Sequence, residues 1–123
     1  MIEPKYRAWD RQLMELFEVL NLEIKFRIAW LHTGCLSKLP RAFDDVVLMP
    51  FTGLVDKNGK EIYEGDIVSI DTDEFDLLVV KYETGIYWLM DGEQGMEYLS
   101  DYYNYVTVVG NIYENPKMVR EVE

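Results

Sequence analysis

The residue types that most often carry out chemistry are scarce in this chain. It has one histidine and one cysteine, His32 and Cys35, with two residues between them. A cysteine becomes a strong nucleophile when a neighbouring base lowers its pKa, and such a pair works best with a third, orienting group. Zinc needs at least three protein ligands, and no further histidine or cysteine exists to supply the third. We therefore expect neither catalysis nor a metal site at His32 and Cys35.

Two loops that bind phosphate or calcium in other proteins are incomplete here. Gly53 and Gly59 enclose five residues, whereas a Walker A loop has four between its glycines. Glu61 stands where that loop needs a hydroxyl for magnesium, and its carboxylate would repel a nucleotide. A calcium loop starting at Asp56 would need an oxygen ligand where the sequence has Lys60. The sequence thus predicts no bound cofactor in this region.

Carboxylates are abundant, and two groups of them could hold a cation or act as an acid–base pair. Residues 71–76 include four acids, but Phe75 occupies a position where calcium needs oxygen. Glu64 and Asp66, with Glu61 nearby, could form a carboxylate pair. A solvated acidic loop and an acid-rich turn beside a strand explain the two groups more simply.

The chain is strongly acidic, and the excess lies in one part of the sequence. Of 123 residues, 12 are Lys or Arg and 23 are Asp or Glu, which gives a net charge of −11. Residues 1–50 hold seven basic and seven acidic residues, residues 51–123 hold five and 16, and residues 82–116 have no Lys or Arg. This charge argues against a basic nucleic-acid-binding domain and favours a soluble, mutually repelling surface. The alternative is an acidic face that docks a basic partner or imitates a phosphate backbone.

The first fifty residues predict strands separated by less regular segments. Residues 5–9 are typical of a short strand, and residues 22–30 alternate apolar and charged side chains as a half-buried strand does. Residues 13–20 fit either a helix or a strand, because eight residues are too few to decide. A proline and its polar neighbours predict a loop over 32–45, and a short strand is expected at 46–48.

From residue 51 onward, short strands and turns alternate closely. Turns are expected at 56–59, 64–66, 83–85 and 91–95, and strands at 67–71, 75–82, 86–90, 96–99 and 106–109. The apolar run 77–80 predicts a strand covered on both faces. Gly110–Asn111 should break the last strand, and Asn115–Pro116 should end regular structure. Short strands separated by glycine turns indicate a mainly β fold, a small barrel or a sandwich, with some α+β character in the N-terminal part.

Three segments resemble the YopX family of phage and prophage proteins. Phe51–Val68, with the sequence FTGLVDKNGKEIYEGDIV, resembles the family signature. Lys5–Asp10 is similar to the family's opening strand, and Val109–Pro116 to its closing motif. The resemblance implies an SH3-like barrel in a bacterial cytoplasm during phage or prophage expression. It implies no activity, no catalytic residue and no cofactor.

The expected organisation has three parts. Residues 1–50 form N-terminal strands and a connection packed on the barrel. Residues 51–116 form the SH3-like β module, and residues 117–123 form a C-terminal tail.

Turn chemistry explains the residues of the matching motifs. The glycines at 53, 59 and 65 fall six residues apart and permit successive tight bends. Asp66 can accept backbone N–H bonds as the chain enters a strand. We therefore predict an architectural role for the following set: Thr52, Gly53, Asp56, Gly59, Tyr63, Gly65, Asp66, Gly110, Asn111 and Pro116.

Four tyrosines gather near the end of one predicted strand: Tyr98, Tyr102, Tyr103 and Tyr105. Aromatic side chains that stack on nucleic-acid bases line a basic groove, and this region has no basic residue. Tyrosine is enriched at protein interfaces, where it supplies contact area at a small entropic cost. We read these four residues as the edge of the core or as a protein-binding patch.

Together these observations predict a non-enzymatic protein-interaction module whose protein partner is unknown. Self-association is a further expectation, because edge strands and exposed aromatics can pair copies of a chain. We expect no direct nucleic-acid binding and no membrane attachment, since no apolar run approaches the ~20 residues that span a bilayer. The single cysteine fits a reducing cytoplasm.

Two other functions stay open. The first is an acidic nucleic-acid mimic that occupies a basic DNA-binding surface of a host or phage protein. The second is an enzyme that uses Glu64 and Asp66, or His32 and Cys35.

Overall fold

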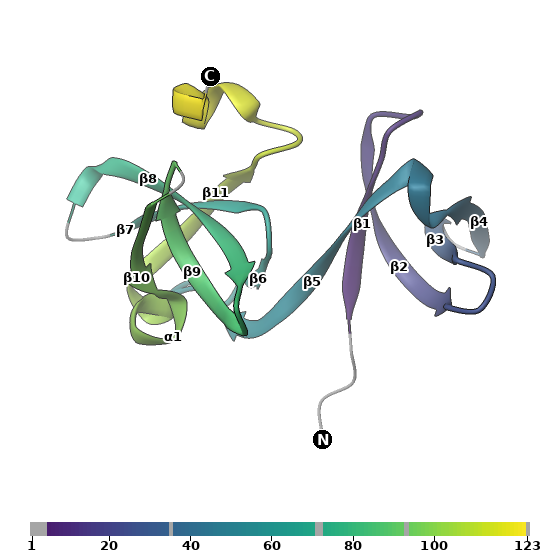
Figure 1. Cartoon of the computed structure of the whole chain (residues 1–123), viewed down its shortest axis with the longest axis horizontal. Coiled ribbons are helices and arrows are strands. Elements are labelled where there is room, and N and C mark those ends of the chain that lie inside the picture. The colour runs from purple at the N-terminus through teal and green to yellow at the C-terminus, as the bar shows by residue number, and fades with distance from the viewer. Residues whose placement is uncertain (1–4, 35, 71–72, 93, 123) are drawn as a thin grey trace. The chain divides into compact units, whose positions relative to one another are not determined.

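The chain folds into two compact units, residues 1–50 and residues 51–123 (Figure 1). The computed structural model describes residues 5–34, 36–70, 73–92 and 94–122. Almost all regular structure is antiparallel β, with one short α-helix and three short 3-10 helices in the described residues. The mainly β fold expected from the sequence is confirmed.

The N-terminal unit is an antiparallel sheet wrapped around a small core. Its strands are β1 (Tyr6–Asp10), β2 (Glu15–Glu23), β3 (Ile28–Gly34), β4 (Ser37–Ala42) and the first half of β5 (Val46–Val55), with the 3-10 helix η1 (Phe43–Asp45) before β5. The order across the sheet is β4-β3-β2-β1-β5. The core consists of four buried residues and the apolar side chains packed on them: Ala8, Ala29, Leu31 and Val46, with Phe17, Val19, Leu22, Leu39, Phe43 and Leu48.

The predicted strand over residues 22–30 is wrong, because the chain reverses in the middle of it. β2 ends at Glu23, the chain turns over Ile24–Arg27, and β3 begins at Ile28. The alternating pattern continues through the turn, so Ile24 and Phe26 face solvent instead of a core. Of residues 13–20, which fitted a helix or a strand, residues 15–20 lie in β2 and residues 13–14 lie in the turn before it.

The loop predicted over residues 32–45 is also wrong. Residues 32–34 end β3, residues 37–42 form β4, and residues 43–45 form η1. Pro40 lies in β4 opposite Trp30, and β4 is the edge of its sheet. A proline is tolerated on an edge strand, because the N–H that it lacks has no neighbouring strand to bond.

The C-terminal unit is built on a five-stranded sheet. Its elements are β6 (Glu61–Tyr63), β7 (Asp66–Ile70), β8 (Asp73–Glu83), β9 (Ile86–Asp91), β10 (Gln94–Tyr98), α1 (Leu99–Tyr102), η2 (Tyr103–Tyr105), β11 (Val106–Asn111) and η3 (Pro116–Val122). The strand order is β10-β9-β8-β7-β11, while β6 pairs with the second half of β5. Eight buried residues form the core: Ile62, Val68, Ile70, Leu78, Val80, Leu89, Leu99 and Val106.

Two boundaries near the C-terminus differ from the expectation. Gly110 and Asn111 do not break the last strand but continue β11, which absorbs the irregularity as a bulge between Val108 and Gly110. Pro116 begins η3 instead of ending regular structure. Proline suits the first turn of a helix, where its missing N–H would have no partner. Residues 78–80 are buried as expected for a strand covered on both faces.

Backbone bonds outside the strand ladders join the β5–β6 turn and the β6–β7 turn to the five-stranded sheet. The N–H of Lys57 donates to the carbonyl of Val106 at 3.1 Å, and the N–H of Gly65 donates to the carbonyl of Val80 at 2.8 Å. In the described residues, the five-stranded sheet does not close into a barrel through strand pairing, because β10 and β11 remain its two edges. The strand pairing therefore shows an open antiparallel sheet.

None of the helices in the described residues is long and apolar enough to cross a membrane.

Candidate protein-interaction site

The turn between β2 and β3 is the candidate site, and hydrogen bonds fix its backbone. Glu23 pairs with Ile28 where the two strands meet the turn. The N–H of Arg27 donates to the carbonyl of Ile24 at 3.1 Å, and the carbonyl of Arg27 accepts the N–H of Phe43 at 2.9 Å. The second bond ties the turn to η1.

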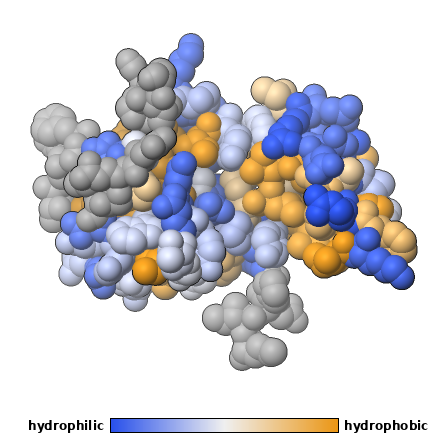
Figure 2. Space-filling view, viewed as in Figure 1, coloured by the Kyte–Doolittle hydropathy of each residue, from blue (hydrophilic) through white to orange (hydrophobic). Residues whose placement is uncertain are grey.

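Large apolar side chains project from this turn into solvent. Ile24 and Phe26 are each 68% exposed, and Leu20 on β2 is 47% exposed. Figure 2 shows apolar residues of the N-terminal unit reaching the visible surface beside strongly hydrophilic ones. Burying one such side chain against a partner stabilises a complex by up to ~1.5–3 kcal/mol. The turn therefore offers two apolar anchors that the fold itself leaves unburied.

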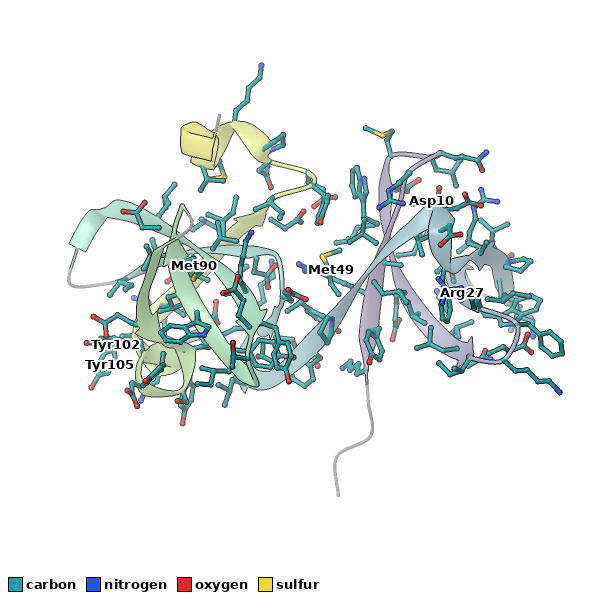
Figure 3. The ribbon with its side chains drawn as sticks, viewed as in Figure 1. Asp10, Arg27, Met49, Met90, Tyr102 and Tyr105 are labelled. Atoms are coloured by element: carbon teal, nitrogen blue, oxygen red, sulfur yellow. The ribbon has the colours of Figure 1, made fainter. Side chains whose placement is uncertain are left out.

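Cations flank these apolar anchors. The Lys25 ammonium lies 5.8 Å from the centroid of the Phe26 ring. The Arg27 guanidinium, labelled in Figure 3, lies 5.2 Å from the Phe43 ring and 3.3 Å from Asp44 Oδ1. Both members of that ion pair are well exposed, so the pair adds little stability. Lys25 therefore lies beside the exposed Phe26 ring, whereas the charge of Arg27 is already paired with Asp44.

Strained backbone conformations and exposed apolar side chains recur at the turns of the N-terminal unit. Arg27 and Met14 adopt left-handed conformations, with φ of +55° and +57°. This region costs a non-glycine residue ~1 kcal/mol or more, and such strain tends to cluster at functional sites. Met14 and Leu36, in the turns after β1 and β3, are also exposed, the latter at 99%. Apolar side chains therefore reach solvent at all three turns of the β1–β4 meander.

Asp10 closes the β1–β2 turn from inside the unit. Its carboxylate accepts the N–H groups of Gln12 and Leu13 at 2.8 and 3.0 Å, and Arg41 Nε donates to it at 2.6 Å. Burial alone would raise the pKa of Asp10, but the Arg41 bond and the two backbone bonds together hold that pKa below its ordinary value. Asp10 is thus an ionised structural group (Figure 3).

The four predicted tyrosines divide into two kinds. Tyr102 and Tyr103 pack against the core of the C-terminal unit. Tyr98 and Tyr105 are 45% and 51% exposed. The Tyr98 ring is tilted against Trp88, with ring centroids 4.9 Å apart, and the Tyr105 ring meets Tyr102 edge-on at 6.3 Å (Figure 3). Two of the four tyrosines thus pack on the core and two are exposed, and a role in protein binding stays a prediction.

Asp56 connects the turn after β5 to the last strand. One carboxylate oxygen accepts the N–H groups of Asn58 and Lys60 at 2.8 and 2.9 Å, and the other accepts the N–H of Val108 at 2.9 Å. Burial would raise the pKa of Asp56, but the bonds from Val108, Lys60 and Asn58 hold that pKa below its ordinary value. Both carboxylate oxygens of Asp56 therefore accept hydrogen bonds from backbone N–H groups of the fold itself.

Other residues of the family-like motifs make comparable bonds inside the C-terminal unit. Thr52 Oγ1 donates to the carbonyl of Ile62 at 2.7 Å, and Asp66 Oδ2 accepts the N–H of Tyr63 at 2.8 Å. Asn111 Oδ1 accepts the N–H groups of Tyr113 and Glu114 at 3.0 and 2.9 Å. The glycines at 53, 59 and 65 all have φ between +86° and +93°.

The remaining motif positions lie at a bulge and a helix start. Gly110 lies at the bulge of β11. Pro116 is the first residue of η3. An architectural role for the whole set stays a prediction.

The carboxylates considered for catalysis accept hydrogen bonds inside the C-terminal unit. Glu61 accepts from the Tyr63 hydroxyl at 3.2 Å, Glu64 from the N–H of Tyr82 at 3.3 Å, and Asp66 from the N–H of Tyr63. His32 lies half-buried in β3, while its proposed partner Cys35 falls outside the described residues. The side chains of residues 71–76 are likewise outside them. Among described residues, no group of three or more His, Cys, Asp or Glu is placed to hold a metal ion.

Sequence reasoning missed the β2–β3 turn. No Gly, Pro, Asn or Asp occurs in Ile24–Arg27, so the usual turn residues were absent. The one available signal was length, because a strand running from residue 15 to residue 34 would greatly exceed the usual 3–10 residues.

The chain is similar to one family and to solved structures from bacteria. Residues 5–120 match the family model described as YopX protein. The SPbeta prophage-derived uncharacterized protein YopX of Bacillus subtilis (strain 168) is 28% identical over 138 residues, covering 96% of this chain and 97% of the relative. The crystal structure of protein EF1440 from Enterococcus faecalis matches with a TM-score of 0.66 and 25% identity, covering 97% of this chain and 99% of that one. The crystal structure of yopX from Bacillus subtilis matches with a TM-score of 0.61 and 18% identity, covering 94% and 95%, and bears on the fold alone.

Proposed function

The chain belongs to the YopX family, and on that premise we propose that it is a phage or prophage accessory protein that binds another protein. The family match spans residues 5–120, and a relative of similar length is named as prophage-derived. The proposal is of a non-enzymatic interaction module that works in the bacterial cytoplasm.

One observation carries this proposal: the fixed β2–β3 turn holds Ile24 and Phe26 in water. Folding does not bury these side chains, and Arg27 adopts a strained backbone beside them. A few large anchors near the centre of an interface carry most of its binding energy, and a fixed loop loses little entropy when it binds. A partner that covers the turn would therefore be stabilised by burying apolar side chains that folding leaves exposed.

We also propose that residues 51–116 form an SH3-like barrel. Support comes from bonds that join the turns on either side of β6 to two different strands of the five-stranded sheet. These bonds run from Lys57 to Val106 and from Gly65 to Val80.

The test is quantitative affinity capture from bacteria that express the tagged full-length chain. The variant Ile24→Ser/Phe26→Ser is compared with the wild type and with Leu36→Ser, which removes an even more exposed apolar side chain at another turn. We expect wild type and Leu36→Ser to retain the same binding protein, whether a different protein or a further copy of the chain. The double variant should retain at least tenfold less of this binding protein.

Thermal denaturation checks that all three proteins are folded before capture. The proposal fails if the wild type retains no protein above the tag alone and does not self-associate. It also fails if the double variant binds as well as the wild type.

A second candidate function is an acidic nucleic-acid mimic. Its support is that the boundary between the two compact units coincides with the change in charge, so that one unit carries the whole excess of −11. The partner would then be a DNA-binding protein that short duplex DNA displaces from the chain, with an affinity that falls steeply as salt rises. A captured partner that stays bound in a large excess of DNA would exclude this function.

A further inference from the structure

We infer that Asn58–Gly59 is a site of spontaneous deamidation that the hydrogen-bonded turn around Asp56 keeps latent. The pair lies between β5 and β6, and both residues are exposed, so water and base reach them. An asparagine followed by glycine is prone to this reaction, because glycine has no side chain that would hinder attack by its nitrogen.

Deamidation at this pair needs only water and base. Base removes the proton from the N–H of Gly59, and the nitrogen attacks Cγ of Asn58, so that a C–N bond forms while the side-chain amide takes up a proton and leaves as ammonia. Water then adds to either carbonyl of the cyclic imide and breaks one of its two ring C–N bonds. The product has an aspartyl or an isoaspartyl residue at position 58, and in the isoaspartyl form the main chain runs through the former side chain.

The backbone of this hairpin requires the glycine that makes the pair reactive. The N–H of Gly59 donates to the carbonyl of Asp56 at 3.0 Å, and the N–H of Asp56 donates to the carbonyl of Lys60 at 2.8 Å. Gly59 has a φ of +86°, as suits the last residue of a three-residue hairpin loop. A residue with a side chain would be strained there, so the fold itself places glycine after Asn58.

The same hydrogen bonds keep the reacting atoms apart. The N–H groups of Asn58 and Lys60, on either side of Gly59, both donate to Asp56 Oδ1, at 2.8 and 2.9 Å. Ring closure requires the Gly59 nitrogen to lose its proton and to turn toward Asn58 Cγ, so the bond from its N–H to the Asp56 carbonyl must open first. The reaction rate is therefore lowered by the fraction of time for which the turn stays closed.

The turn is held closed by β11 as well as by its own bonds. Asp56 Oδ2 accepts the N–H of Val108 at 2.9 Å, and the N–H of Lys57 donates to the carbonyl of Val106 at 3.1 Å. An isoaspartyl residue adds a carbon to the main chain inside this turn, so the bonds on its two sides no longer fit together. Deamidation would thus convert a transient opening into a permanent one.

The experiment follows the loss of the amide at position 58 in the purified full-length chain at mildly alkaline pH, with tandem mass spectrometry of its peptides to locate the change. Folded wild type should lose this amide about tenfold or more slowly than wild type unfolded in urea, because only opened turns react. The variant Asp56→Asn cannot accept all three backbone bonds, so its folded form should react about fivefold or more faster than folded wild type.

Asp66→Asn is the matched control for the variant of Asp56. It changes another buried carboxylate of the same unit, one that accepts the N–H of Tyr63 and lies outside the reactive turn. Thermal denaturation checks that both variants are folded. The rate at position 58 in Asp66→Asn should stay within about twofold of the wild type, since local opening of one turn does not require opening of another.

A second comparison separates the new charge from the altered main chain. The isoaspartyl product is purified by ion exchange and compared with Asn58→Asp, which carries the same charge on an unaltered main chain. The melting temperature of the isoaspartyl product should lie about 3 °C or more below that of Asn58→Asp.

Each other outcome overturns the inference. Equal rates in folded and unfolded wild type do so, as do an amide that persists in urea, equal acceleration by the two variants, and equal melting of the isoaspartyl product and Asn58→Asp. If Asp56→Asn does not fold, hydrogen exchange at the Gly59 N–H in wild type decides, because it must be slowed by the same factor as deamidation to within about threefold. The proposed function concerns a different turn and stands or falls separately.

Discussion

Asp56 illustrates how single residues hold this fold together. Its carboxylate accepts three backbone N–H bonds, two within its own turn and one from Val108, 52 residues further along the chain. The side chain is almost fully buried, so its charge depends on these donors. One carboxylate thereby fixes both the turn after β5 and the position of β11.

The first prediction concerns Asp56→Asn. The amide cannot accept all three bonds, and an unsatisfied buried N–H should lower the free energy of unfolding by ~1–3 kcal/mol at pH 7. The folded-state pKa of Asp56 lies below its ordinary value of 3.8, so its stabilising effect is present above that value and is lost as the pH falls through the folded-state pKa. Urea denaturation from pH 7 to pH 2 should therefore show a smaller acid-induced loss in the variant.

The control for this prediction is Asp91→Asn, which changes an exposed carboxylate in the same unit. Its stability at pH 7 should stay within ~0.5 kcal/mol of the wild type. Equal losses in the two variants would contradict the role assigned to Asp56.

A second prediction at this scale concerns Gly110→Ala. A Cβ at Gly110 would lie 2.5 Å from Asn115 Oδ1, the atom that accepts the N–H of Asn111 at 3.2 Å. The methyl group must displace that side chain, which should cost ~1–2 kcal/mol of stability and shift the amide resonance of Asn111. Val109→Ala, at the exposed neighbour, should leave that resonance nearly in place. An unshifted Asn111 amide in Gly110→Ala would show that the close approach is not maintained.

At the scale of elements, the sequence predicted the C-terminal strands better than the N-terminal ones. The turns at Asp56–Gly59 and Glu83–Gly85 each contain a glycine, which tolerates positive φ, so their positions could be predicted from local chemistry. The turn at Ile24–Arg27 has no such residue, and its alternating pattern continues the one in the strands on either side. What fixes that bend is tertiary, since the carbonyl of Arg27 bonds the N–H of Phe43. Local sequence reasoning has no access to a contact of that range.

The third prediction concerns the β8–β9 hairpin. Thr84 and Gly85 both have positive φ, +55° and +79°, as a type I′ turn requires. Gly85 meets this requirement at no steric cost, whereas a β-branched Thr84 is strained. Thr84→Asn should create the preferred Asn-Gly turn and raise the free energy of unfolding by ~0.5–1 kcal/mol.

Thermal denaturation measures this change, and Thr33→Asn is the matched control. Thr33 is an exposed strand residue whose φ is not positive, so the same substitution there should be neutral or slightly destabilising. A lower melting temperature for Thr84→Asn than for the wild type would contradict the assignment of strain to Thr84.

For the whole molecule, charge and hydrophobic cores divide at the same place in the sequence. The change from a balanced to an acidic composition could be read by counting, and it falls at the boundary between residues 1–50 and 51–123. The candidate site could not be found in that way. Ile24 and Phe26 have the composition of core residues, and only the position of a turn makes them surface residues. Exposed apolar groups of this kind become visible once the tertiary structure decides which positions the core leaves uncovered.

The last prediction tests whether the two cores are separate cooperative units. Leu31 and Leu89 are fully buried, one in each core, and the two sets of buried core residues share no member. Leu31→Ala and Leu89→Ala should each remove ~2–5 kcal/mol of stability, because a leucine-sized cavity opens among side chains that relax only partly. Hydrogen exchange followed by mass spectrometry should show the larger loss of protection in β1–β4 for Leu31→Ala and in β7–β11 for Leu89→Ala. If both variants gave the same exchange map, a single cooperative unit would span the chain, and the turn could no longer be treated as a feature of an N-terminal unit with its own core.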